Sequence, residues 1–458
     1  MVASAKTWAG MLGRLAFGAG LALTLAAAPA AAQPSGFGAA VAPVVDPAYD
    51  ALFAAVLRDP SNLDLSFRFA EAATRRGDYE AAIGALERIV FYNPDLPRVK
   101  LELGVLYFRL GSYEMARSYF QGAVSGGDAP VEVQSRVAGF LSEIDRRTNV
   151  QQLSVYAQVG YRHQTNANAG PMSQLVRAFG QDAILGRQFL NKPDWNAFGL
   201  AAVRHVYDFE NQRGDVWETN VAAYASGQFR FSLLNIGLVE VQTGPRLALA
   251  PDILPGVSVR PYGLVNGVTL GDQRYLATTG GGVSMSIPLA SWLVVEPFVE
   301  GRSRRFERSA EYPIANQQTG SLWASGLFMQ GALGSMLGAD LRWQVRGAFI
   351  RNDARSRFDY NSYDSFAVDV GLPIEFAGPW GSRRWALVPT AGYAHYDYDT
   401  ANAFIDPLVR RRDHEYRVGA LLDVPIYDFA GFAVQVQYSE INSRLRNYDT
   451  RNLSVAFG

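Results

Sequence analysis

From Leu153 onward, apolar and polar residues alternate in short stretches that are separated by turn residues. Successive side chains of a β-strand point to opposite faces, so each stretch predicts a strand with one apolar and one polar side. The three clearest apolar rows are Leu153, Val155, Ala157, Val159 and Tyr161; Leu341, Trp343, Val345 and Phe349; and Phe366, Val368, Val370, Leu372 and Ile374.

The polar rows contain arginine, for example Arg162, Arg342 and Arg346. A soluble β-sandwich hides its apolar faces in a core between two sheets. A membrane barrel turns its apolar face to lipid and keeps a polar lumen, in which arginine is readily accommodated. The pattern therefore favours an antiparallel transmembrane β-barrel.

We predict about fourteen strands, an even number that is typical of single-chain bacterial barrels. The long connections, 165–193, 308–318, 354–361 and 400–411, all follow odd-numbered strands. Long loops on the outer side and short turns on the periplasmic side are the expected asymmetry, which assigns the residues before the first strand to the periplasm. The predicted strands are 153–164, 194–209, 215–231, 233–249, 257–270, 274–288, 291–307, 319–334, 338–353, 362–376, 384–399, 412–427, 430–442 and 447–457.

Residues 49–147 have helical spacing and an internal repeat. Seven positions recur after 34 residues, which is the period of tetratricopeptide (TPR) repeats. The matched pairs are Phe69 and Leu103, Ala70 and Gly104, Gly77 and Gly111, Tyr79 and Tyr113, Ala82 and Ala116, Leu86 and Phe120, and Ile89 and Ala123. The glycines are expected to end the first helix of each unit, and the alanines to lie where two helices approach closely. Such a short solenoid has two interpretations, a peptide-binding surface or a spacer, since about three repeats usually make a stable stack.

The N-terminus has the features of an export signal. Lys6 and Arg14 precede an apolar stretch that is too short to span a bilayer, and Ala30-Ala31-Ala32 offers a cleavage site. We therefore predict an α+β chain in separate domains: a signal peptide at 1–32, a linker at 33–48, a periplasmic TPR-like helical domain at 49–150 and an outer-membrane β-barrel at 151–458. No later segment has the roughly 20 apolar residues of a transmembrane helix.

The sequence offers no motif for catalysis or cofactor binding. It has no cysteine, no GxSxG elbow and no phosphate-binding loop, and none of its four histidines has a metal-ligand spacing. His163 and His205 could approach each other across neighbouring strands, but without a carboxylate ligand motif beside them we favour their interpretation as polar lumen or loop residues. We accordingly predict no enzyme activity and no catalytic, cofactor-binding or metal residue. The net charge of −1 gives no reason to expect a nucleic-acid partner.

Arginine clusters fall at the predicted outer ends of three strands. They have two interpretations: an anion-attracting mouth, or ordinary contact with lipopolysaccharide headgroups, which we favour. Asp353, Asp359 and Asp364 near the same end make the local field mixed. The clusters are Arg302, Arg304, Arg305 and Arg308; Arg351, Arg355 and Arg357; and Arg410, Arg411 and Arg412.

Two motifs carry a family resemblance. Residues 160–171, GYRHQTNANAGP, pair a glycine and an aromatic residue with an Asn-containing turn and a proline. Residues 442–452, NSRLRNYDTRN, lead from a Ser/Asn turn through Tyr-Asp to an arginine. With the signal peptide, the short repeats and the barrel, the chain resembles the surface lipoprotein assembly modifier (Slam) family of Gram-negative outer membranes. The repeat region is shorter than is typical of that family.

The resemblance implies a translocon-like barrel that helps a protein client, a surface lipoprotein, reach the cell surface, with the lumen beside strands 153–164 and 430–457 as its passage. It implies outer-membrane lipid and lipopolysaccharide as surroundings. The outward alternation of Leu453, Val455 and Phe457 gives the barrel-assembly machinery a signal to recognise. Two alternatives stay open: an exopolysaccharide export channel, which needs an open lumen lined by aromatic and acidic residues, and a passive porin.

Overall fold

The computed structural model describes residues 47–458 except 60–61, 126–129, 212 and 381–382. In this part of the chain, helices form one compact unit up to Gln152, and strands form a second unit from Leu153. The predicted signal peptide and residues 33–46 of the predicted linker lie outside the described residues. The last two linker residues already belong to a helix that begins at Pro47.

The helical unit contains two consecutive helix pairs that repeat at the predicted period. Gly77 and Gly111 follow the first helix of each pair, and both have positive φ values, 84° and 76°, which glycine adopts without steric cost. Ala82 and Ala116 are fully buried. The helices described in this unit are α2 Pro47–Arg58, α3 Leu63–Arg76, α4 Tyr79–Tyr92, α5 Pro97–Arg109, α6 Tyr113–Val124 and α7 Val131–Thr148.

The closest helix contact in this unit is between α5 and α6. A Cβ atom added to Gly104 would lie 2.5 Å from the ring of Phe120, which is itself completely buried. Phe120 in turn stacks on Phe140 of α7, with the ring centroids 4.9 Å apart. The absence of a side chain at Gly104 therefore lets α5, α6 and α7 share one core.

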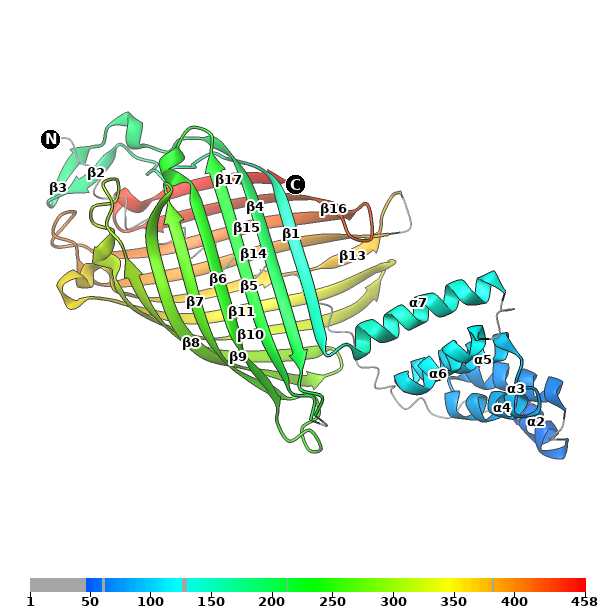
Figure 1. Ribbon diagram of the computed structural model, residues 1–458. Coiled ribbons are helices and arrows are strands. Elements are labelled where there is room, and N and C mark those ends of the chain that lie inside the picture. The colour runs from blue at the N-terminus through cyan, green and yellow to red at the C-terminus, as the bar shows by residue number, and fades with distance from the viewer. Residues whose placement is uncertain (1–46, 60–61, 126–129, 212, 381–382) are drawn as a thin grey trace. The chain divides into compact units, whose positions relative to one another are not determined.

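The strands form a closed antiparallel barrel of fourteen strands, as predicted (Figure 1). Pairing of β10 with β11 and of β1 with β17 closes the ring. β12 and β13 together make one wall strand, which is interrupted at Leu372 and Pro373. The barrel strands are β1 Gln151–Gln164, β4 Asp194–Asp208, β5 Val216–Gln228, β6 Ile236–Ala248, β7 Ser258–Leu270, β8 Gln273–Ala290, β9 Leu293–Phe306, β10 Gly320–Met336, β11 Ala339–Ala354, β12 Tyr363–Gly371, β13 Ile374–Ala377, β14 Arg384–Ala401, β15 Arg410–Pro425, β16 Gly431–Ser443 and β17 Thr450–Phe457.

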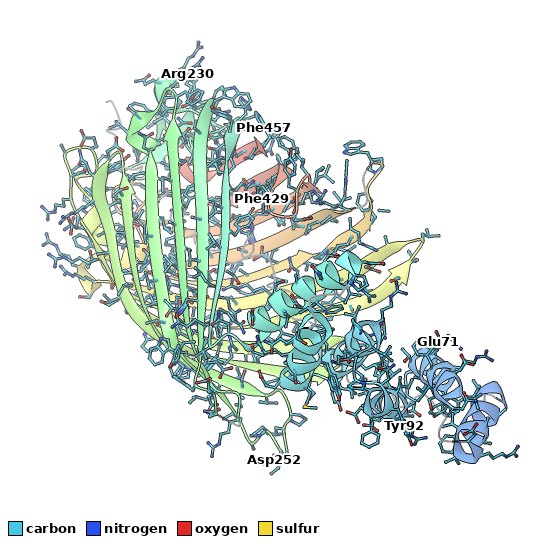
Figure 2. All side chains as sticks on the ribbon, turned by 45° about the vertical axis from the view of Figure 1, so that its right-hand side comes forward. Glu71, Tyr92, Arg230, Asp252, Phe429 and Phe457 are labelled. Carbon is cyan, nitrogen blue, oxygen red and sulfur yellow. The ribbon has the colours of Figure 1, made fainter. Side chains whose placement is uncertain are left out.

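The two ends of the barrel differ. We call the end at which β1 finishes the loop end, and the end at which β1 begins the turn end. All four predicted long connections lie at the loop end, and most turn-end links are short. The exception is 249–257, where Asp252 projects beyond the strand ends (Figure 2).

The first long connection contains structure that the sequence did not predict. Within 165–193, β2 Leu175–Ala178 and β3 Gln181–Ile184 form a hairpin. Phe179 and Gly180 at its tip both have positive φ values, as a type I′ turn requires. Strands of four residues are too short for alternation to reveal them.

The outward rows are apolar and exposed, whereas the inward rows are polar. Val155, Val265 and Val299 are more than half exposed on the outer surface. Such an apolar exterior around a closed barrel is consistent with an outer-membrane protein. Among the described residues, no helix is both long and apolar enough to cross a membrane.

Gly104→Ala should destabilise the helical unit by about 1–3 kcal/mol, because the new methyl group overpacks Phe120. Gly84→Ala is the matched control, since nothing lies within 4 Å of its added Cβ. That change should stabilise α4 by about 0.5–1 kcal/mol through helix propensity. Limited proteolysis of the full-length protein during heating measures both effects; equal protease resistance of the two variants would contradict the packing account.

A capped lumen and a short seam as the candidate functional site

The polar wall of the lumen is a set of paired charges. Glu218 of β5 is almost fully buried, and its carboxylate lies 3.1 Å from Arg204, 2.9 Å from Arg246 and 3.7 Å from Arg260. These arginines come from β4, β6 and β7, so one carboxylate ties four strands together. Removing a single partner from such a group would leave uncompensated buried charge, which is strongly destabilising.

Further pairs follow around the wall. Arg302 of β9 bonds Glu240 at 2.7 Å, and Tyr262 donates to Glu300 at 2.9 Å. In another part of the wall, Arg417 of β15 bonds Asp369 of β12 at 2.7 Å, across the intervening strand β14. The lumen wall therefore carries both signs of charge in neutralised pairs.

Several arginines of the predicted clusters at the loop end are also paired with carboxylates. Arg351 bonds Asp399 at 2.6 Å, and Arg410 and Arg412 both bond Asp397. Arg304 lies inside the barrel and donates to Asn352. These carboxylate partners reduce the positive field that an anion-attracting mouth needs, so the geometry disfavours that interpretation.

Loops fold over the loop end of the lumen. The connection between β9 and β10 includes Tyr312 and Ala315, which are buried against the inward side chains Leu238, Val268 and Phe306. The short helix 356–361 contacts the same connection, where Tyr360 donates to Gln317 at 2.7 Å.

A cavity of about 40 Å³ lies beneath the short helix 356–361. That volume accommodates only a few water molecules. We call this arrangement the cap. Twelve residues from the loops and from β9 to β15 line the cavity: Arg304, Gln318, Asn352, Tyr360, Asn361, Tyr363, Tyr398, Thr400, Asn402, Arg411, Leu445 and Tyr448.

The β2–β3 hairpin completes the cap through contacts with two distant loops. Arg177 bonds the buried carboxylate of Asp406 at 2.9 Å. The backbone of Arg177 exchanges two hydrogen bonds with the side chain of Asn447, both 2.9 Å long. The Leu408 backbone N–H also donates to Asp406, and with Arg177 it lowers the pKa of this carboxyl group from its usual value. Sequence reasoning missed these residues, because loop contacts carry no periodic signal.

Closure of the barrel rests on a short ladder between β1 and β17, which we call the seam. Only four residue pairs, from Tyr161↔Phe457 to Gln164↔Ser454, form it. The β16–β17 ladder has eight pairs and the β15–β16 ladder thirteen. β1 continues toward the turn end beyond the level at which β17 finishes (Figure 1).

Aromatic side chains on the outer surface reinforce the seam. Phe457, labelled in Figure 2, lies 6.2 Å from both Tyr161 and Trp195 between ring centroids. His163 packs on Trp195 at 5.0 Å. At the base of the ladder Gly160 is essential for close approach, since a Cβ there would lie 2.2 Å from the Phe457 carbonyl oxygen.

The histidines do not form the pair that strand order suggested. His163 contacts Trp195, and the neighbouring pair is His395 with His414, whose rings are 4.7 Å apart across β14 and β15. Knowing the strand register would have revealed this pair. No group of three or more His, Cys, Asp or Glu side chains in the described part of the chain has the arrangement of a metal site.

Gly160→Ala should weaken the seam, because the added methyl group forces β1 and β17 apart at an overpacking cost of about 1–3 kcal/mol. Gly199→Ala on β4 is the control, as its Cβ meets nothing within 4 Å. We expect the first variant alone to unfold at a temperature several degrees lower. The measurement is the heat-induced mobility shift of the barrel in detergent gels; an unchanged midpoint for Gly160→Ala would contradict this role.

Asp406→Asn should release the hairpin from the cap at neutral pH. Because the folded-state pKa is lowered, ionised Asp406 stabilises the cap above about pH 4, and this contribution is lost as the pH falls further. We expect several-fold faster hydrogen exchange in β2 and β3 for the variant at pH 7, and in the unmodified protein only below about pH 4. Asp428→Asn, at the turn end, is the control. A hairpin equally protected in all three proteins would refute the tether.

Comparison with known proteins bears on the helical unit. The tetratricopeptide repeat family model matches residues 48–130, which agrees with the 34-residue period. No curated protein matches. The structures of similar fold include "MamA MSR-1 C2", with 20% identity, 22% of this chain and 57% of that chain covered, and a TM-score of 0.20. The match therefore spans little more than half the length of that protein.

Two structures of chaperones in complex with a bound segment of another protein also match over 22% of this chain. One is the Yersinia enterocolitica type III secretion chaperone SycD in complex with a peptide of the translocator YopD, with 17% identity, 81% of that chain covered and a TM-score of 0.21. The other is PcrH in complex with the chaperone binding region of PopD, with 18% identity, 75% of that chain covered and a TM-score of 0.20. The family match and the strand order together show that the chain contains tetratricopeptide repeats followed by a closed fourteen-stranded barrel.

Proposed function

We propose that this chain is an outer-membrane barrel of a Gram-negative bacterium that helps a protein client, a surface lipoprotein, reach the cell surface. In this proposal the helical unit lies in the periplasm and the loop end faces outward among lipopolysaccharide. The barrel-assembly machinery inserts the barrel, and the chain itself catalyses no reaction. The observation that carries the proposal is a capped, charge-paired barrel joined to tetratricopeptide repeats.

The cap argues against passive conduction. The loops that fold over the loop end enclose a cavity of about 40 Å³, which is too small to hold a sugar or a comparable solute. Sugar passage also needs free acidic groups on the lumen wall, and carboxylates there are neutralised by arginines such as Arg302 and Arg417. Both features disfavour the porin and the polysaccharide channel.

The helical unit has a surface suited to a polypeptide. A shallow groove of about 430 Å³ lies between α5 and α7, with Phe108 and Phe140 at its base and Arg136 and Glu143 at its rim. Aromatic surface flanked by opposite charges fits an extended peptide that carries one apolar side chain among polar ones. The resemblance of the two sequence motifs to the Slam family points to the same class of client.

Deletion of the gene tests the proposal. We expect one or a few lipoproteins to lose surface exposure at least tenfold, while their total amount stays constant, because their delivery step is missing. Protease treatment of intact cells followed by mass spectrometry measures exposure, and re-expression of the full chain is the control. Unchanged exposure of every lipoprotein would refute the proposal.

A barrel without residues 49–147 separates the alternatives. We expect it to assemble but to leave the same lipoproteins unexposed. Equal conductance and solute uptake, with lipoprotein exposure unaffected, would instead support a passive porin in which the repeats are incidental.

A further inference from the structure

The turn-end half of β1 has an unpaired edge among the described residues. Tyr161 pairs with Phe457, and the Thr165 backbone N–H donates to the Leu453 carbonyl oxygen at 3.0 Å. Odd-numbered residues of β1 therefore bond across the seam, and even-numbered residues bond toward β4, because the two directions alternate in an antiparallel ladder. The backbone groups of residues 153, 155 and 157 consequently point toward the seam side, where no described strand pairs with them, whereas the Val159 carbonyl oxygen faces Gly458.

The side chains of this half of β1 are those of a membrane-embedded strand. Leu153, Val155 and Val159 point outward and are 66%, 65% and 75% exposed. Their inward neighbours, Ser154 and Gln158, are polar. Unpaired backbone N–H and C=O groups next to a lipid-facing apolar row are costly, because hydrocarbon offers no hydrogen-bond partner. The edge therefore has the chemistry of a site for one more strand.

We propose that an extended segment of the client polypeptide binds this edge by strand addition, antiparallel to β1 and in line with β17. This inference rests on the proposed function and names the part of the barrel that holds the client. The segment that fits alternates apolar residues, which face lipid beside Val155, with small polar residues, which face the lumen beside Gln158. The free edge runs from Gln151 to Gln158, so a segment of about eight residues spans it.

The position of the edge favours a client over a second copy of the chain. The inward side of the edge is continuous with the lumen, and the cap closes the loop end, so a polypeptide in the lumen meets this edge as its lateral boundary. The seam itself stays anchored by the aromatic contact between Phe457 and Tyr161, and the loop before β17 by the hydrogen bonds between Arg177 and Asn447. Strand addition at the turn end thus leaves barrel closure intact.

Disulfide trapping tests the edge directly. The sequence has no cysteine, so Gln158→Cys introduces a unique thiol at a non-hydrogen-bonded position, where facing Cα atoms of paired strands lie close enough for a disulfide. Gln330→Cys is the matched control, because Gln330 also faces inward but its strand is paired on both sides. The probe is a nine-residue peptide of alternating valine and serine that begins with valine and has cysteine in place of its first serine, because a strand in line with β17 begins beside Gln158.

We expect the full-length Gln158→Cys protein in phospholipid vesicles to form at least tenfold more peptide adduct than Gln330→Cys. A peptide with a proline next to its cysteine should lose that advantage, since proline cannot complete the ladder. Equal adducts at both sites would overturn the proposal. A Gln158→Cys homodimer that excludes the peptide would overturn it as well, by showing that a second copy occupies the edge.

A second variant links the edge to the client. Ala157→Pro removes an N–H that points toward the seam, whereas Ala157→Val keeps it at the same place. We expect the proline variant to lower exposure of the lipoproteins identified by gene deletion about tenfold, with normal barrel assembly, and the valine variant to behave as the unmodified protein. If deletion abolishes exposure but Ala157→Pro does not, the edge proposal fails and the proposed function stands. If deletion has no effect while trapping at position 158 succeeds, the proposed function fails and strand binding at the edge stands.

Discussion

Backbone hydrogen bonding in a medium without water is the constraint on which this barrel depends. Neighbouring wall strands from β4 round to β17 share ladders of at least eight residue pairs, but β1 and β17 share only four. The ring is therefore closed by a short ladder, and side-chain contacts at that point contribute an unusually large share of the closure. Tyr161, Trp195 and Phe457 supply them on the outer surface.

Ion pairs between arginines and carboxylates stabilise the lumen wall. Arginine side chains that line a lumen repel one another. Carboxylates such as Glu218 and Asp369 neutralise this positive charge by forming ion pairs with the arginines of neighbouring strands. Because Glu218 bonds arginines from three neighbouring strands, it also fixes the relative register of that part of the wall. An ion pair also holds the cap together: Arg177 of the hairpin bonds Asp406, which lies in a loop more than 220 residues away in sequence.

The helical unit is governed by close packing. Its two repeats bring helices together at small residues, and Gly104 is the position at which one methyl group decides whether α5 and α6 fit. An aromatic groove between α5 and α7 then remains at the surface, at the side of the unit where the last helix pair meets its terminal helix. The arrangement of α5, α6 and α7 thus produces both the close contact at Gly104 and the aromatic groove at the surface.

The sequence by itself determined the two architectures. A 34-residue recurrence and a two-residue alternation are local periodicities, so they predicted the helix pairs, the fourteen strands and which side of each strand faces the lumen. Only the tertiary structure decided the length of the seam, the bond between Arg177 and Asp406 and the partners of the histidines. These features depend on strand register and on loops far apart in the chain, and neither is encoded in a repeating local pattern.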